Sequence, residues 1–149
     1  MDTRQYVTVA FIIASIVNFF LSVFIYLSKI QANLGADGAL TGCFLDGGCG
    51  TVQTSHYATT LGISNPLYGV VAFFFLTVFF TWSLFANPKY GLIAFVDGVM
   101  ALGTLFSVWL LYVQYIILQE TCIYCLWVDS IMIGMFIVYF AYWRWFFVK

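Results

Sequence analysis

The four cysteines of this chain fall into two pairs whose spacing suits redox chemistry. Cys43 and Cys49 lie in a glycine-rich segment, and Cys122 and Cys125 form a Cys-x-x-Cys motif where a helix is expected to begin. A cysteine at a helix N-terminus faces unpaired backbone N–H groups and the positive end of the helix dipole, which both favour its thiolate. Cys125 follows one turn later on the same face. These four residues are therefore the candidate catalytic groups of a thiol–disulfide exchange.

Two other uses of the cysteines compete with catalysis. Structural disulfides are the first, but a bridge within Cys-x-x-Cys closes a very small loop and so stabilises weakly. A four-cysteine zinc site is the second, because Cys-x-x-Cys pairs are common zinc ligands. The spacing of Cys43 and Cys49 does not match that motif, so no metal is expected. The lone His56 is interpreted as a bystander. The pairing stays open at this point, because four cysteines allow three connectivities.

The composition indicates that the cysteines are carried by a membrane protein. Of the 149 residues, 64% are hydrophobic and 7% are charged, whereas a soluble domain carries about 25% charged residues. A helix needs roughly 20 mostly apolar residues to cross a bilayer. Four stretches meet that length, at residues 6–27, 66–85, 91–118 and 123–143. The sequence therefore predicts an all-α membrane protein, with residues 1–149 forming a single domain built as a four-transmembrane-helix bundle.

Two loops of this bundle carry all four cysteines. A long loop at residues 28–65 joins the first two helices, and residues 119–122 join the last two. Because two crossings separate these loops, both open on the same side of the membrane. Loops as long as the first are usually functional, and residues 51–61 are expected to form a short helix along the interface.

The basic residues predict which side of the membrane the two cysteine-bearing loops face. Four of the five would lie on the side of the termini, opposite the cysteines, and cytoplasmic segments are rich in Lys and Arg. These four are Arg4, Lys89, Arg144 and Lys149, with Lys29 on the other side. The prediction is an integral membrane protein with both termini in the cytoplasm and all cysteines on the extracytoplasmic side, where disulfides persist.

Two cysteine pairs at different depths suggest an electron relay. The loop pair can meet a protein partner in water, and the Cys122/Cys125 pair can exchange with it through a mixed disulfide. A lipid-soluble quinone is an economical electron acceptor at Cys125, because it dissolves in the bilayer and fits between helices. Asp129 lies one turn beyond Cys125, and ionisable residues at such depth are functional candidates, here for proton transfer or for a structural hydrogen bond. Asp97 is expected to have only a structural role, as the partner of a basic residue.

Three segments resemble one known family. They are CGTVQTSHYA at residues 49–58, GISNPLYG at residues 62–69 and CIYC at residues 122–125. In these motifs and in their order, the chain resembles the vitamin K epoxide reductase family, in its bacterial and archaeal form without a fused thioredoxin domain.

The resemblance implies a role for each matching residue. Cys43 would meet a separate thioredoxin-like partner, Cys49 would pass electrons to Cys122, and Cys125 would reduce a quinone of the menaquinone, ubiquinone or vitamin K type. The implied quinone-binding residues are Ser55, Asn65, Tyr68 and Asp129. The implied location is the prokaryotic cytoplasmic membrane, and the implied physiological role is disulfide formation in exported proteins, with no nucleic acid involved.

Two alternatives accompany this interpretation. The first is a reductase that recycles vitamin K epoxide or a related quinone. Animal members have a tyrosine where this chain has Asp129, so the polar contact with an epoxide would differ here. The second alternative is a non-catalytic membrane protein whose loops are held by structural disulfides.

Overall fold

The computed structural model describes residues 3–33, 47–86 and 88–143, and its helices dominate the fold. The long helices are α1 (Thr3–Asn33), α4 (Asn65–Phe85), α5 (Tyr90–Tyr112) and α6 (Ile123–Val138). Helix α5 continues as the π-helix η2 (Val113–Leu118), and α6 continues as the π-helix η3 (Tyr139–Trp143). Four spans within these helices are long and apolar enough to cross a membrane, which confirms the four predicted spans.

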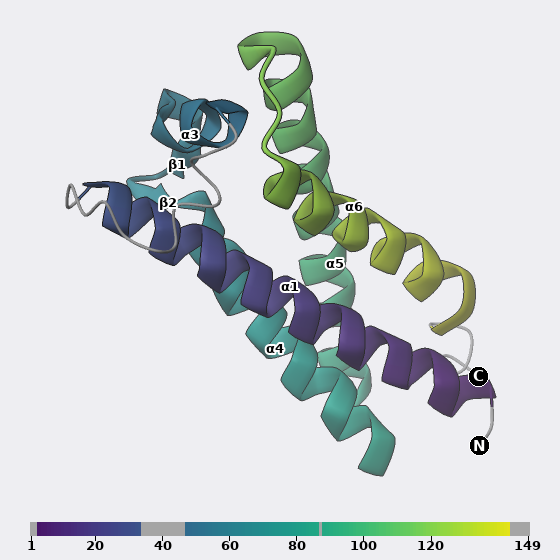
Figure 1. Cartoon of the computed structure of the whole chain (residues 1–149). Coiled ribbons are helices and arrows are strands. Elements are labelled where there is room, and N and C mark those ends of the chain that lie inside the picture. The colour runs from purple at the N-terminus through teal and green to yellow at the C-terminus, as the bar shows by residue number, and fades with distance from the viewer. Residues whose placement is uncertain (1–2, 34–46, 87, 144–149) are drawn as a thin grey trace.

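The long helices pack as two pairs. Helix α1 lies along α4, and α5 lies along α6, while α1 also contacts α6 and so joins the pairs (Figure 1). The buried rings of Phe11 and Phe80 stack between the helices with their centroids 4.8 Å apart. Both rings meet the buried Tyr139 edge-on, and its hydroxyl donates a hydrogen bond to Asp97 at 2.7 Å. Asp97 thus takes part in a structural contact that a tyrosine hydroxyl supplies, and its pairing with a basic residue stays a prediction.

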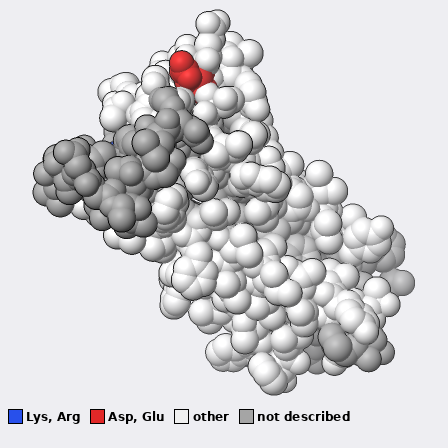
Figure 2. Space-filling view, viewed as in Figure 1, with Lys and Arg blue, Asp and Glu red and all other residues white. Residues whose placement is uncertain are grey.

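The outer surface of the bundle is apolar. Large hydrophobic side chains such as Phe20, Trp82 and Leu102 are at least 60% exposed, an arrangement that suits lipid rather than water. Among the described atoms of the face in Figure 2, charge is confined to a red patch near the end that carries α3 and the α5–α6 connection. The face along the helices is white.

The segment between α1 and α4 holds short elements. They are α3 (Gly47–Thr54), the 3₁₀-helix η1 (His56–Ala58), β1 (Thr59–Thr60) and β2 (Ile63–Ser64). Strands β1 and β2 pair antiparallel, with Thr60 opposite Ile63. The loop predicted for residues 28–65 is described only in part, because residues 34–46, and Cys43 with them, lie outside the described residues. Within the described part, α1 extends to Asn33.

One prediction for this segment is wrong. The helix expected at residues 51–61 begins earlier, ends at Thr54 and gives way to β1. The reason is the turn at Leu61 and Gly62, whose φ angles of 54° and 79° are both positive, as a tight two-residue hairpin turn requires. With this small hairpin as the only described sheet, the fold is nearly all-helical, in line with the predicted class.

The described cysteines gather at one end of the bundle. The start of α1 and the end of η3 lie at the opposite end from α3, the hairpin and the α5–α6 connection (Figure 1). Lys29, near the end of α1, donates a hydrogen bond to the backbone oxygen of Ala58 at 3.3 Å and ties α1 to η1. Cys49 on α3 and Cys122 before α6 lie in contact at this same end. Which side of the membrane this end faces stays a prediction.

Candidate functional site

The sulfur atoms of Cys49 and Cys122 are in direct contact. They lie 2.7 Å apart, and both side chains are fully buried. Cys49 is disulfide-bonded, whereas Cys122 and Cys125 are free thiols. The separation is longer than a covalent S–S bond of about 2.05 Å, so the contact is a non-bonded one. A thiol of the Cys-x-x-Cys motif therefore lies against a disulfide sulfur of α3, as the partners of an exchange reaction must.

Two hydrogen bonds, one from Cys125 and one to Gln114, hold Cys122 in place at the start of α6. Cys122 is the N-cap residue, and its sulfur accepts a hydrogen bond from the backbone N–H of Cys125 at 3.4 Å. Its own backbone N–H donates to the side-chain oxygen of Gln114 at 3.1 Å. Gln114 is buried in η2 and also accepts, through its backbone oxygen, the N–H of Glu120. Gln114 thus anchors the turn that delivers Cys122.

The surroundings of Cys122 favour its thiolate. The side-chain hydrogen bond from Cys125 lowers the pKa of Cys122, and the backbone N–H groups of Cys125 and Tyr124 add to this effect. Burial of the sulfur opposes the shift, but the pKa still lies below its ordinary value. Because the thiolate is the reactive form of cysteine, Cys122 is suited to exchange with Cys49.

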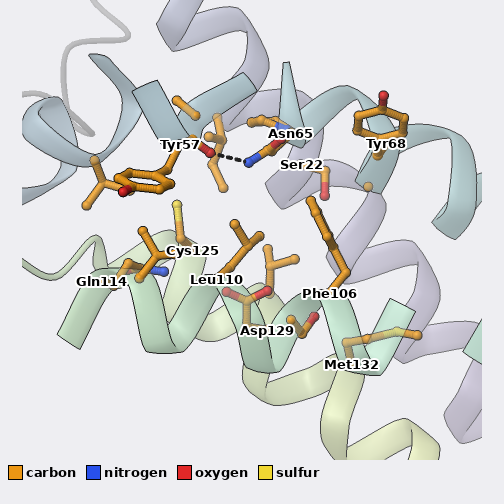
Figure 3. Close-up of a pocket in the computed structure, with 18 of the residues that line it drawn as sticks. Ser22, Tyr57, Asn65, Tyr68, Phe106, Leu110, Gln114, Cys125, Asp129 and Met132 are labelled. Atoms are coloured by element: carbon orange, nitrogen blue, oxygen red, sulfur yellow. Dashed lines mark hydrogen bonds between the residues drawn. The ribbon is translucent and has the colours of Figure 1, made fainter. Parts of the chain in front are cut away.

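Cys125 lies in the wall of a cavity inside the bundle. The cavity measures about 160 Å³ and is lined mostly by apolar side chains of α1, α4, α5 and α6. In Figure 3 the sulfur of Cys125 points toward the segment that carries Tyr57 and Asn65. A largely apolar space with a few polar groups is typical of small-molecule sites.

Asp129 lies on the same wall, one helical turn beyond Cys125. It is 3% exposed, and its Oδ2 atom has no hydrogen-bond partner among the described residues. The hydroxyl of Ser107 interacts with the same carboxyl group. A buried carboxyl oxygen without a protein partner is costly, and here it belongs to a residue that lines the cavity.

Asn65 and Tyr68 also line the cavity, but their polar atoms already have protein partners. The Asn65 side-chain N–H donates to the backbone oxygen of Tyr57 at 2.7 Å, and its oxygen accepts the hydroxyl of Thr60 at 2.8 Å. The Tyr68 hydroxyl donates to the backbone oxygen of Thr60 at 2.9 Å. These contacts hold η1 and the hairpin over the cavity and leave Asn65 one further amide hydrogen.

The remaining residues singled out in the sequence have different surroundings. Ser55 lines the cavity, and its hydroxyl donates to the backbone oxygen of Val52 at 2.7 Å. His56 is exposed next to Tyr57. Cys43 lies outside the described residues. In the part of the chain that the structure describes, no three His, Cys, Asp or Glu side chains are grouped so that they could hold a metal ion.

Three residues of the site were missed in the sequence. Gln53 donates a hydrogen bond from Nε2 to the sulfur of Cys125 at 3.2 Å, and Gln114 holds Cys122. Gly48 lets α3 approach the start of α6, because a Cβ atom there would lie 2.5 Å from the backbone oxygen of Thr121. The sequence did offer signals for the two glutamines. Gln114 is a polar residue within the apolar stretch at residues 91–118, and Gln53 follows Cys49 by four residues.

Comparison with known proteins identifies the family of this chain. No curated protein matches the chain significantly. The model of the vitamin K epoxide reductase family matches residues 9–140, a region that contains all four cysteines and the cavity. Members of that family are oxidoreductases that use quinones. With most of its length covered by that match, this integral membrane protein belongs to the vitamin K epoxide reductase family.

Proposed function

We propose that this protein is a membrane thiol oxidase that passes electrons from a separate thioredoxin-like protein to a quinone. Its role would be to support disulfide formation in exported proteins. The observation that carries the proposal is the contact of 2.7 Å between the sulfurs of Cys49 and Cys122. Cys125 extends the path, because it is three residues further along and lines the apolar cavity.

The first transfers are thiol–disulfide exchanges. A thiolate of the partner attacks the loop disulfide at Cys43, and the partner leaves oxidised while the loop pair becomes reduced. The Cys49 thiolate then attacks Cys122 of an oxidised Cys122–Cys125 pair. The Cys49–Cys122 bond forms, the Cys122–Cys125 bond breaks, and Cys125 leaves as a thiolate.

A second exchange completes the transfer. Cys43 attacks Cys49, which closes the loop disulfide and releases Cys122 as a thiolate, a form that its lowered pKa favours. The loop pair is then oxidised and the inner pair reduced. A disulfide-bonded Cys49 beside free Cys122 and Cys125 is consistent with this stage.

The inner pair then gives its electrons to the quinone. Cys122 and Cys125 together lose two electrons and two protons and close their disulfide, and the quinone becomes the hydroquinone. In this proposal the largely apolar cavity beside Cys125 takes a quinone head group of the menaquinone, ubiquinone or vitamin K type. Asn65 would donate its remaining amide hydrogen to a quinone carbonyl, Ser55 and Tyr68 would form part of the wall, and Asp129 would supply a proton.

Comparison of two electron donors tests this relay. With the purified protein, quinone reduction is followed with dithiothreitol and with a reduced thioredoxin-like protein. Cys49→Ala should lose turnover with the protein donor, because no loop disulfide can then form for that donor to attack, while dithiothreitol still drives reduction by reaching Cys122 and Cys125 directly. Cys125→Ala should fail with both donors, because no thiol then faces the cavity. Full activity of Cys49→Ala with the protein donor would contradict the relay.

The same assay separates the two alternatives. If vitamin K epoxide is reduced faster than the quinone with dithiothreitol, the recycling activity takes precedence. If neither donor reduces any quinone, the cysteines serve only as structural disulfides.

A further inference from the structure

Helix α3 contacts both cysteines of the Cys-x-x-Cys motif through one face. Cys49 and Gln53 are four residues apart and therefore lie one turn apart on the same side of the helix. The sulfur of Cys49 contacts the sulfur of Cys122 at 2.7 Å, and the Nε2 atom of Gln53 donates a hydrogen bond to the sulfur of Cys125 at 3.2 Å. A single helix thus meets the attacked sulfur and its redox partner together.

Gln53 makes this contact from a buried position. Its side chain is 5% exposed, and its Oε1 atom is buried without a hydrogen-bond partner among the described residues. Burying an unpaired amide oxygen costs stability that an apolar side chain of similar size would not lose. The contact between Nε2 and Cys125 is the one described interaction that requires an amide at this position.

We propose that Gln53 is a positioning residue that stabilises Cys125 as the leaving thiolate while Cys49 bonds to Cys122. This inference rests on the proposed relay. When the Cys49 thiolate attacks Cys122, the Cys49–Cys122 bond forms, the Cys122–Cys125 bond breaks, and both electrons of the broken bond stay on Cys125. An N–H donor binds the resulting anion more strongly than a neutral thiol, and a stabilised thiolate leaves faster.

The arrangement also links the donor to the attack. Because Gln53 and Cys49 belong to one helix, Cys125 receives its donor when α3 is seated with Cys49 at Cys122. The close approach of Gly48 to the backbone oxygen of Thr121 belongs to the same seating. Stabilisation of the Cys125 thiolate therefore coincides with the exchange step that creates it.

The pH dependence of alkylation at Cys125 tests this role without quinone or partner. Cys122→Ser leaves Cys125 as the free thiol of the motif, and the loop disulfide stays closed. In this background, Gln53→Leu should move the pH of half-maximal alkylation by N-ethylmaleimide upward by about one unit, so that the rate at neutral pH falls about tenfold. Gln53→Glu keeps the shape but offers a carboxylate that only accepts hydrogen bonds when ionised, so its shift should be at least as large.

Thr54→Ala is the matched control. Thr54 is exposed on the same helix, and its hydroxyl bonds only to backbone oxygens of α3 among the contacts described. Its alkylation curve should overlay that of the Cys122→Ser parent. Thermal unfolding of each variant identifies those that remain folded.

The result separates the inference from the proposed function. If a folded Gln53→Leu or Gln53→Glu variant has the parent's alkylation curve, the role of Gln53 is refuted, although the relay stands. If Cys125→Ala with an intact Gln53 still reduces quinone, the relay is refuted, and the leaving-group role is refuted with it.

Discussion

The sulfur atoms of Cys49 and Cys122 lie 2.7 Å apart, although 73 positions separate the two residues in the chain. The contact joins α3, in the segment between the first two membrane-spanning helices, to the start of the last. Partly buried side chains surround the two sulfurs, namely Phe24, Val52, Tyr124 and Cys125. Reacting groups that are held in contact need no diffusive encounter, so this geometry makes exchange between the cysteine pairs effectively unimolecular.

Gly48→Ala should slow the relay at this contact. The added Cβ atom would lie 2.5 Å from the backbone oxygen of Thr121, so α3 or the start of α6 must shift. Overpacking of this kind costs about 1–3 kcal/mol, which corresponds to a rate loss on the order of tenfold or more if it falls on the exchange step. Turnover with a reduced thioredoxin-like protein should fall by that factor, while turnover with dithiothreitol is retained.

Gly98→Ala is the control for this prediction, because a Cβ atom there meets nothing within 4 Å. Equal losses in Gly48→Ala and Gly98→Ala would show that close approach of α3 is unimportant.

The reactivity of Cys122 should depend on its neighbour Cys125. Because the hydrogen bond from Cys125 lowers the pKa of Cys122, iodoacetamide should alkylate Cys122 half-maximally at a lower pH than an ordinary thiol. Removal of the donor in Cys125→Ala destabilises the thiolate, so the curve should move to higher pH by about one unit. Mass spectrometry of the Cys122 peptide across a pH series measures this, and a curve that stays in place would exclude the Cys125 thiol as the cause.

Asn65→Ala should weaken quinone turnover and leave exchange between the cysteine pairs intact. One lost hydrogen bond to a neutral acceptor is worth about 0.5–1.5 kcal/mol, so kcat/KM for the quinone should fall by roughly tenfold. The substitution also removes the contacts with Tyr57 and Thr60, so the unfolding temperature should decrease. Steady-state kinetics with the quinone varied give the first value, and unchanged kinetics would remove Asn65 from the quinone site.

Asp129→Asn should slow quinone reduction at a step after thiol exchange. The amide keeps the size of the carboxyl group but cannot deliver a proton, and general acid catalysis contributes about 100-fold or more. In a single-turnover experiment, the reduced protein is mixed with quinone and hydroquinone formation is followed. Ser107→Ala removes a neighbour of the carboxyl and leaves the acid in place, so it should lose much less activity. An Asp129→Asn protein with full activity would assign Asp129 a structural hydrogen bond only.

The orientation in the membrane can be tested at Cys43. The basic residues predict that the cysteine end of the bundle faces outward. In intact bacterial cells treated with a reductant, a membrane-impermeant maleimide should therefore label Cys43. Labelling that requires broken membranes would invert the topology.

The sequence alone determined the membrane architecture and the chemistry of the motif. Length and apolarity are local properties, so the four spans were found within a few residues of α1, α4, α5–η2 and α6–η3. The Cys-x-x-Cys spacing likewise specified a helix N-cap at Cys122 with Cys125 one turn below, because such a motif needs no distant contact. The hairpin after α3 was missed because positive φ angles at Leu61 and Gly62 override the helical pattern of the preceding residues.

The tertiary structure decided how the two cysteine pairs meet. The packing of α3 against the start of α6 depends on the absence of a side chain at Gly48 and on the turn that Gln114 anchors. Gly48 and Gln114 lie 66 residues apart in the chain. That packing brings Gln53 to Cys125, 72 positions away in the chain. Such contacts are set by packing between segments that are remote in the chain, which no periodicity or spacing within one segment encodes.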